Sequence, residues 1–204
     1  LTMVNEISIL ERLVTNLIQQ GFKRLVIITG YCENYIRGRL GTQVGNMQIE
    51  YIFSPCYATT NNIYSLWLAR KIINEPFLLL ESDLVFDVSL LDDMRYPDRI
   101  AISHMQPWMN GSTVTVDQFS QVRKFHNGIT GRFDVIRYKT VNIYSFSVRS
   151  WHKIEERLNR YISAGKTNNY YETVFAEMVA DESLSLKTVY FDNKLWYEID
   201  TIAD

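Results

Sequence analysis

The stretch "PFLLLESDLVFD", residues 76 to 87, runs four apolar side chains directly into Glu81, Ser82 and Asp83. An unbroken apolar run with a proline at its entry predicts a strand covered on both faces, as central parallel strands of α/β sheets are. Acidic side chains inside such a sheet would be costly, whereas the carboxyl end of a strand opens onto the crevice where α/β sheets bind ligands. The stretch therefore predicts both a fold class and the position of a site.

The composition predicts one globular domain spanning residues 1–204. With 47% hydrophobic and 22% charged residues, a chain of 204 residues can bury a substantial core. A formal net charge of -2 gives no attraction to nucleic acid or to anionic lipid. No apolar stretch approaches the roughly 20 residues that a membrane span needs. We therefore expect a small-molecule partner, with neither nucleic acid nor membrane.

The two cysteines, Cys32 and Cys56, are not clustered, and no signal peptide precedes them in this sequence. Reduced thiols in a cytoplasmic protein are the expectation for such a pattern.

Helical and strand-like patterns alternate over the first half of the chain. Ser8 and Glu11 form the pattern of a capping box, and the apolar periodicity that follows predicts a helix ending at Gly21. The order helix, strand, helix, strand, helix, strand predicts parallel pairing through right-handed crossovers. The segments after the first helix are a strand at 24–31, a short helix through 35–36, a strand at 48–54, a helix at 61–74 and the strand at 76–87.

The second half of the chain is less regular. Residues 112–126 predict two strands joined by a turn around Asp117, which would form a small β insertion. Taken together, the patterns predict an α/β fold with a mixed, mostly parallel sheet flanked by helices. The remaining segments are strands at 99–104 and 138–147 and helices at 150–164 and 169–181.

A second acidic stretch, "KLWYEID" at 194–200, repeats the arrangement of Glu81 and Asp83 with Glu198 and Asp200. Residues i and i+2 of a strand point to the same face, so each pair can present both acids to one place. If the two strand ends meet, the carboxylates repel one another without a cation, and Mg²⁺ is the simplest occupant. The alternative is that these acids only form turns and helix caps after strands.

Six blocks of sequence carry a resemblance to a known family. In order, they are "YATTNNIYSLWLAR", "FLLLESDLVFD", "WMNGSTVTVD", "YKTVNIYSFS", "NYYETVFAEMV" and "WYEIDTIAD". They resemble the nucleotidyltransferases related to CTP:phosphocholine cytidylyltransferase. The pattern is most similar to the cytidylyltransferase-like domain that some bacterial proteins fuse to an aminotransferase or a phosphonate-pathway enzyme. The resemblance covers essentially the whole chain.

The resemblance implies a Rossmann-like nucleotidyltransferase fold that uses CTP and Mg²⁺ and releases pyrophosphate. It implies that Asp83 is catalytic and binds the metal, that Asp200 is the second metal ligand, and that Glu198 assists at the metal or the acceptor. Asn61 and Asn62 resemble residues near the nucleotide. Their side chains fit that role, because an amide offers both donors and acceptors. For Asn61 the alternative is a helix cap.

Lys139 resembles a catalytic cation that neutralises charge on the transferred phosphoryl group, the alternative being a solvated lysine at a strand start. The acceptor side of the pocket is expected to be aromatic and acidic, which suits a small phosphate or phosphonate bearing an amine. The alternative for each aromatic residue is core packing. The residues that resemble this side are Trp108, Tyr171, Glu172, Trp196, Tyr197 and Glu198.

The family carries a first strand, a glycine-rich loop and a Pro-Lys pair that this sequence lacks. The segment "LTMVNEISILER" resembles the part that follows that lysine. We therefore expect a fragment that is inactive alone, with a fused C-terminal enzyme domain as a possible partner. A sugar-1-phosphate nucleotidyltransferase and a catalytically silent nucleotide-binding module are the alternatives.

Overall fold

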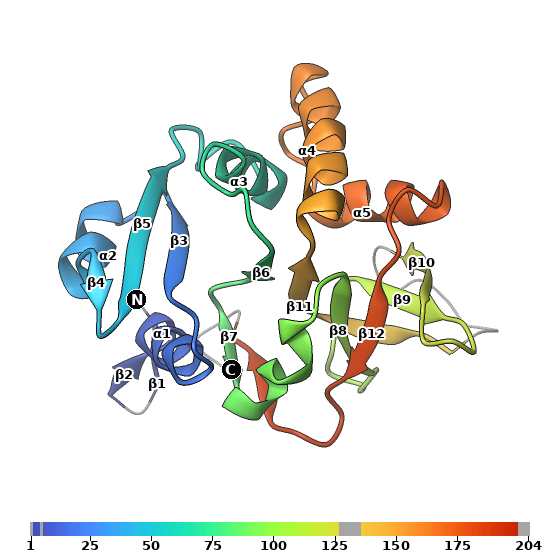
Figure 1. Cartoon of the computed structure of the whole chain (residues 1–204), viewed down its shortest axis with the longest axis horizontal. Coiled ribbons are helices and arrows are strands. Elements are labelled where there is room, and N and C mark those ends of the chain that lie inside the picture. Colours follow the sequence, from blue (N-terminus) through green and yellow to red (C-terminus); the bar gives the residue numbers. More distant parts are fainter. Residues whose placement is uncertain (1, 5, 127–135, 200–204) are drawn as a thin grey trace.

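A computed structural model describes residues 2–4, 6–126 and 136–199 of the chain, and its elements form an α/β arrangement (Figure 1). A short hairpin of β1 (Met3–Val4) and β2 (Ile7–Ser8) leads into helix α1 (Ile9–Gln19). The Ser8 side chain accepts a hydrogen bond from the Glu11 backbone N–H, and the Glu11 carboxylate accepts one from the Ser8 backbone N–H. The predicted capping box is therefore confirmed.

The first sheet consists of β3 (Arg24–Thr29), β4 (Gln43–Val44) and β5 (Met47–Phe53). Strands β3 and β5 are parallel and are joined through helix α2 (Glu33–Leu40), as the alternating pattern predicts. Helix α3 (Asn62–Ala69) then leads toward the second sheet.

Helix α3 is shorter than the predicted 61–74. The backbone N–H of Lys71 bonds to the carbonyl of Leu68, so the helical spacing tightens immediately after Ala69. The guanidinium of Arg24 in β3 donates a hydrogen bond to the carbonyl of Ile72, which links this segment to β3. A distant side chain thus helps to end the helix.

The second sheet is built around β11 (Tyr138–Phe146). On one side β11 pairs with β8 (Arg99–His104), and on the other with β6 (Phe77–Leu80) and the β insertion. The insertion is the predicted hairpin of β9 (Thr113–Val116) and β10 (Val122–His126), and β12 (Lys187–Tyr190) lies on the far side of β8.

The expectation of a mostly parallel sheet is wrong. Within the described residues, only the β3–β5 and β8–β12 ladders are parallel. The chain leaves β8, makes the β9–β10 hairpin and returns as β11, which therefore runs antiparallel to β8 and also to β6. The sheet is mixed because one long returning strand occupies its centre.

Residues 76–87 do not form one strand. Strand β6 ends at Leu80, and β7 (Leu84–Phe86) starts after Glu81, Ser82 and Asp83 in a separate antiparallel pair with β13 (Trp196–Glu198). The acids occupy the turn between the two strands, at the carboxyl end of β6 as predicted. Two short 3₁₀ helices, η1 (Val88–Leu91) and η2 (Asp93–Arg95), follow β7.

Two hydrophobic clusters cover the two faces of the sheets. Helices α3, α4 (Val148–Ser163) and α5 (Tyr171–Ala180) contribute to one cluster, in which Trp151 and Phe175 are fully buried. Helix α1 and the 3₁₀ segment contribute to the other, around Met47 and Leu91. No described helix has the length and apolar character needed to span a membrane.

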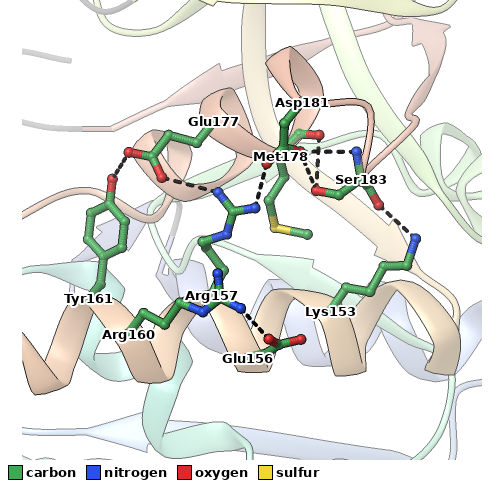
Figure 2. A network of polar contacts seen from close by, with 9 residues as sticks. All are labelled: Lys153, Glu156, Arg157, Arg160, Tyr161, Glu177, Met178, Asp181 and Ser183. Carbon is green, nitrogen blue, oxygen red and sulfur yellow. Dashed lines mark hydrogen bonds and ion pairs between the residues drawn. The ribbon is translucent and has the colours of Figure 1, made fainter.

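Helix α4 is tied to α5 by a polar network on their outer faces (Figure 2). The Arg157 guanidinium reaches both Glu177 and Asp181, and the Tyr161 hydroxyl donates to Glu177. Lys153 donates to the backbone carbonyl of Ser183 just beyond α5. These contacts hold α5, whose first residues face the site described next.

Candidate active site

The two acidic stretches meet through one amide. The Nδ2 of Asn142 lies 3.0 Å from Glu81 Oε2 and 2.6 Å from Glu198 Oε1, so it donates to both carboxylates. Glu81 comes from the end of β6 and Glu198 from the end of β13, two segments more than a hundred residues apart. The cluster of Glu81, Asn142, Glu198 and Lys139 is called the carboxylate cluster below.

Asn142 sits in a bulge of β11, where the register with β8 shifts between Thr140 and Tyr144. Its φ of 60° is in the left-handed region, which asparagine tolerates better than most residues. The Thr140 hydroxyl donates to Asn142 Oδ1 at 3.1 Å and orients the amide. Asn142 was not among the predicted site residues, although an amide inside the apolar run "VNIYSF" was a signal.

Lys139 is buried, with 2% of its surface exposed. Its Nζ lies 3.1 Å from Glu198 Oε2 and donates to the carbonyl of Thr140 at 2.8 Å. The alternative of a solvated lysine at a strand start is therefore wrong. A Cβ placed on Gly111 would lie 3.4 Å from this Nζ, so the loop before β9 closes over the lysine at a glycine whose φ is +92°.

Asn62 and Tyr171 hold the other side of Glu81. The Asn62 amide and the Tyr171 hydroxyl donate to Glu81 Oε1 at 3.1 and 2.8 Å. Asn62 Oδ1 also accepts from the Tyr171 backbone N–H at 2.9 Å, which links α3 to the start of α5. Asn61 is the N-cap of α3, and its side chain accepts from the Asn62 N–H, so the capping alternative describes its observed contact.

Burial dominates the electrostatics of the acids. Burial raises the pKa of Glu81, and the nearby charges of Asp83 and Glu198 raise it further, while hydrogen bonds from Tyr171 and Asn62 oppose the shift. Burial followed by the charge of Glu81 raises the pKa of Glu172 to about 7. Within the described part of the chain, Glu172 Oε2 is buried and has no hydrogen-bond partner. Burial thus favours the protonated forms of Glu81 and Glu172.

Asp83 lines the same cavity as Glu81, Glu198 and Asn62. Its carbonyl accepts a hydrogen bond of 3.0 Å from the backbone N–H of Ile199, and Asp200 lies outside the described residues. Among residues 2–4, 6–126 and 136–199, no three His, Cys, Asp or Glu side chains form a metal site on their own. Mg²⁺ is commonly held by one or two carboxylates together with substrate phosphates and water. The carboxylates of Asp83, Glu81 and Glu198, which line one cavity, are oxygen donors of that kind.

The residues expected on the acceptor side of the pocket lie in separate places. Tyr171 and Glu172 are buried beside the carboxylate cluster. Trp108, which is 66% exposed, lies with Trp196 in a different cavity of about 540 Å³. Tyr197 is partly exposed on β13. Among the described side chains, a single aromatic wall is therefore not observed.

Comparison with known proteins gives relatives in sequence and in structure. Over an alignment of 214 residues the chain is 26% identical to CMP-5'-(3-aminopropyl)phosphonate synthase of Streptomyces rubellomurinus, and the match covers all of this chain and 34% of that protein. The chain thus spans about a third of the length of this curated relative. No protein-family profile matches the chain.

Two solved structures share the fold. The inositol-1-phosphate CTP transferase from T. maritima aligns with a TM-score of 0.78 and 17% identity, over 99% of this chain and 80% of that one. The CTP:phosphocholine cytidylyltransferase from Streptococcus pneumoniae aligns with a TM-score of 0.80 and 16% identity, over 98% and 83%.

The chain has the nucleotidyltransferase fold, with an acidic crevice at its strand ends. Within that class, the sequence relative and the two structures named above are of the cytidylyltransferase kind, which confirms the resemblance to the group related to CTP:phosphocholine cytidylyltransferase.

Proposed function

We propose that this domain transfers a cytidylyl group from CTP to a small phosphate or phosphonate that bears an amine. An oxygen of the acceptor attacks the α-phosphorus of CTP and forms the new P–O bond. The bond from the α-phosphorus to the bridging oxygen breaks, and pyrophosphate leaves with that electron pair. The observation that carries the proposal is the meeting of the β6 and β13 ends around the buried Lys139. The curated relative and the structural neighbours support it.

In this proposal Asp83 and Asp200 hold Mg²⁺. The hydrogen bond from Ile199 N to Asp83 O supports the pairing, because Asp200 is the next residue of the chain. Bound Mg²⁺ would neutralise triphosphate charge and polarise the phosphoryl group under attack. Lys139, held by Glu198 within 3.1 Å, supplies a positive charge that is already positioned inside the site.

The acceptor amine is assigned to Glu172. Its buried Oε2, which lacks a hydrogen-bond partner among the described residues, can accept from an ammonium group, and the nearby Glu81 adds negative charge. The name of the curated relative specifies an aminopropyl phosphonate, a molecule that carries both groups. Asn62 joins α3 to this region and is proposed to lie near the nucleotide. The rest of the protein is proposed to include a fused C-terminal enzyme domain.

The test is an acceptor panel, assayed by pyrophosphate release from CTP and Mg²⁺. The protein used carries about 25 residues of its own upstream sequence, enough for a strand and a loop. The panel contains 3-aminopropylphosphonate, 2-aminoethylphosphonate, phosphocholine and a hexose-1-phosphate. We expect the amine-bearing phosphonates to be preferred.

Propylphosphonate is the matched control, because it differs from 3-aminopropylphosphonate only by the amine. We expect kcat/KM to fall at least about tenfold for propylphosphonate with the native protein, and to differ little between the two acceptors in Glu172→Gln. A preference for the hexose-1-phosphate would overturn the acceptor assignment and leave nucleotidyl transfer standing.

A further inference from the structure

The segment that joins β12 to β13 delivers Glu198 to the carboxylate cluster. Strand β13 follows this segment and has Glu198 as its last residue. Figure 1 shows the segment leaving the end of the second sheet and crossing to β7. The position of Glu198 relative to Lys139 and Asn142 therefore depends on what holds residues 191–195.

Apolar packing holds the two ends of this segment more than its middle. Phe191 is buried and Trp196 is half-buried, whereas Leu195 is 85% exposed. A cavity of about 540 Å³ separates the segment from the loop after β8 that carries Trp108. Among the described strands, β13 and β7 form a two-stranded ribbon separate from the two larger sheets. Such ribbons are marginally stable by themselves, so further contacts must place β13.

The Asp192 carboxylate contacts the end of β8 at three points. Its Oδ1 accepts from the Ser103 hydroxyl at 2.8 Å and from the His104 backbone N–H at 2.7 Å. Its Oδ2 lies 2.7 Å from His104 Nδ1. Burial acts to raise the pKa of Asp192, but the hydrogen bonds from His104 and Ser103 outweigh burial and hold this pKa below its ordinary value. The carboxylate and its three contacts are called the Asp192 clamp below.

The Asp192 clamp lies next to Lys139. In the ladder of β8 and β11, Ser103 is opposite Lys139, and paired residues of neighbouring strands project to the same face. Both residues are buried. The ring of His104 packs edge-on against Tyr138, the residue before Lys139, with 4.9 Å between the ring centroids. The clamp thus ties the turn after β12 to the strands that hold Lys139.

Two carboxylates therefore secure the two ends of one short segment. Asp192 holds its start against β8, and Glu198 holds its end against Asn142 and Lys139. A segment that is fixed at its start has fewer conformations to lose when its end binds. The Asp192 clamp therefore favours the observed contacts of Glu198.

We propose that Asp192 is a positioning residue for nucleotidyl transfer. It fixes the path of β13, so that Glu198 meets Lys139 and Asn142 in the geometry that the reaction needs. Asp192 acts through Glu198 and not by touching the substrate. The effect on rate rests on the proposed function, whereas the effect on β13 can be measured without any reaction.

The first measurement is kinetic and uses the protein with its upstream segment, CTP, Mg²⁺ and 3-aminopropylphosphonate. Asp192→Ala removes all three contacts, and we expect kcat to fall at least about tenfold while KM for CTP changes less than about threefold. Asp192→Asn keeps an oxygen that can accept from the Ser103 hydroxyl and the His104 N–H, so its kcat should stay within about threefold of native. Ser103→Ala removes one contact and should cost less than Asp192→Ala.

Asp117→Ala is the matched control. Like Asp192, Asp117 lies between two strands and accepts hydrogen bonds from the backbone, here from the N–H groups of Phe119 and Gln121. It belongs to the turn of the β insertion, away from β13. Its replacement should leave kcat nearly unchanged.

The second measurement is amide hydrogen exchange in the 204-residue chain, which needs no substrate. In Asp192→Ala the amides of residues 196–199 should exchange at least about tenfold faster than in the native chain, while those of α4 keep their native rates. In Asp192→Asn and Asp117→Ala, the amides of residues 196–199 should also keep their native rates.

Either measurement can overturn the proposal. Unchanged exchange at residues 196–199 in Asp192→Ala, or equally faster exchange throughout the chain, would show that Asp192 does not place β13. In a protein that releases pyrophosphate, a near-native kcat for Asp192→Ala, or an equal loss for Asp192→Asn, would also contradict it. If the native protein releases none, the proposed function fails, and the exchange measurement alone decides whether Asp192 positions β13.

Discussion

Asn142 combines an unusual backbone conformation with a bridging side chain. Its φ of 60° lies where a Cβ is unfavourable, and its amide donates to two carboxylates that would otherwise face each other. Strain of this kind persists when the surrounding contacts determine it, and such residues cluster at functional sites. Asn142 is thus the residue on which the geometry of the carboxylate cluster depends.

Two substitutions separate the backbone effect of Asn142 from its side-chain effect. Asn142→Gly removes the amide but adopts a positive φ freely, whereas Asn142→Ala removes the amide and retains the strain. We expect both to lower the free energy of unfolding, and Ala to be less stable than Gly by about 1 kcal/mol. Urea denaturation measures the difference. Equal stability of the two variants would show that the bulge relaxes.

Glu172 should make stability depend on pH. Because burial raises its pKa from the ordinary 4.5 to about 7 in the folded protein, the unfolded chain releases this proton at lower pH. The contribution of Glu172 therefore becomes less favourable to folding as pH rises from 4.5 through about 7. Glu172→Gln should stabilise the protein at about pH 8, relative to its effect at about pH 5, by at least about 1 kcal/mol.

The pH experiment compares urea unfolding of the variant and the native chain at the two pH values. Glu156→Gln is the control, because it changes an exposed carboxylate and its effect should be the same at both. An identical effect of Glu172→Gln at the two pH values would contradict the prediction.

The proposed metal ligands give a kinetic prediction. If Asp83 and Asp200 share one Mg²⁺, alanine at either position should lower kcat by about 10²-fold or more in the protein with its upstream segment. The double variant should lose far less than the product of the two single losses, because each removal disables the same unit. Near-native rates in either single variant would remove that residue from the site.

At the scale of elements, the α4–α5 network holds the far end of α5, the helix whose first residue, Tyr171, donates to Glu81 (Figure 2). Arg157 is mostly covered, with 21% of its side chain exposed, and reaches Glu177 of α5 and Asp181, the C-cap of that helix. The Arg160 side chain is 66% exposed and, within the described part of the chain, pairs with Glu156 of the same helix. The two arginines therefore form a matched pair for testing the connection between the helices.

Arg157→Ala should lower the free energy of unfolding by about 1 kcal/mol, and Arg160→Ala by less than about 0.5 kcal/mol, because exposed pairs within one helix contribute little. Thermal denaturation of the two variants checks this. A larger loss for Arg160→Ala would show that the interhelical contacts are not the stabilising ones.

The sequence predicted the elements whose ends are set by local side chains. The capping box at Ser8 begins α1, and Asp117, which accepts from the N–H groups of Phe119 and Gln121, forms the predicted turn of the β insertion. The sequence did not predict the element ends that depend on distant groups. One example is the end of α3, where Arg24 donates to the carbonyl of Ile72. Strand β12 was not predicted. Its four residues form a strand through their pairing with β8, a distant segment of the chain.

At the scale of the whole molecule, the α/β class and the position of the acids followed from apolar runs and strand ends. The direction of β11 could not be predicted, because the sequence pattern of a strand is the same whether it pairs parallel or antiparallel. The bridging role of Asn142 could not be predicted either, since it depends on two carboxylates brought close only by the fold.

At the same scale, the proposed function predicts a difference in activity between the 204-residue chain and a longer one. The 204-residue chain should release no pyrophosphate from CTP, and the chain extended by about 25 upstream residues should do so, because phosphoryl transfer depends on positioning. Phosphate-release assays with coupled pyrophosphatase compare them directly. Equal activity of the two chains would show that the upstream segment is dispensable for the chemistry.

The pairing of β7 with β13 also sets an order of events during synthesis. Strand β7 leaves the ribosome long before β13, its pairing partner near the end of the described residues. At roughly 5 to 20 residues per second, β7 would wait on the order of 5 to 22 seconds without that partner. During that interval its unpaired edge is a target for chaperones, and Glu198 has not yet joined the carboxylate cluster.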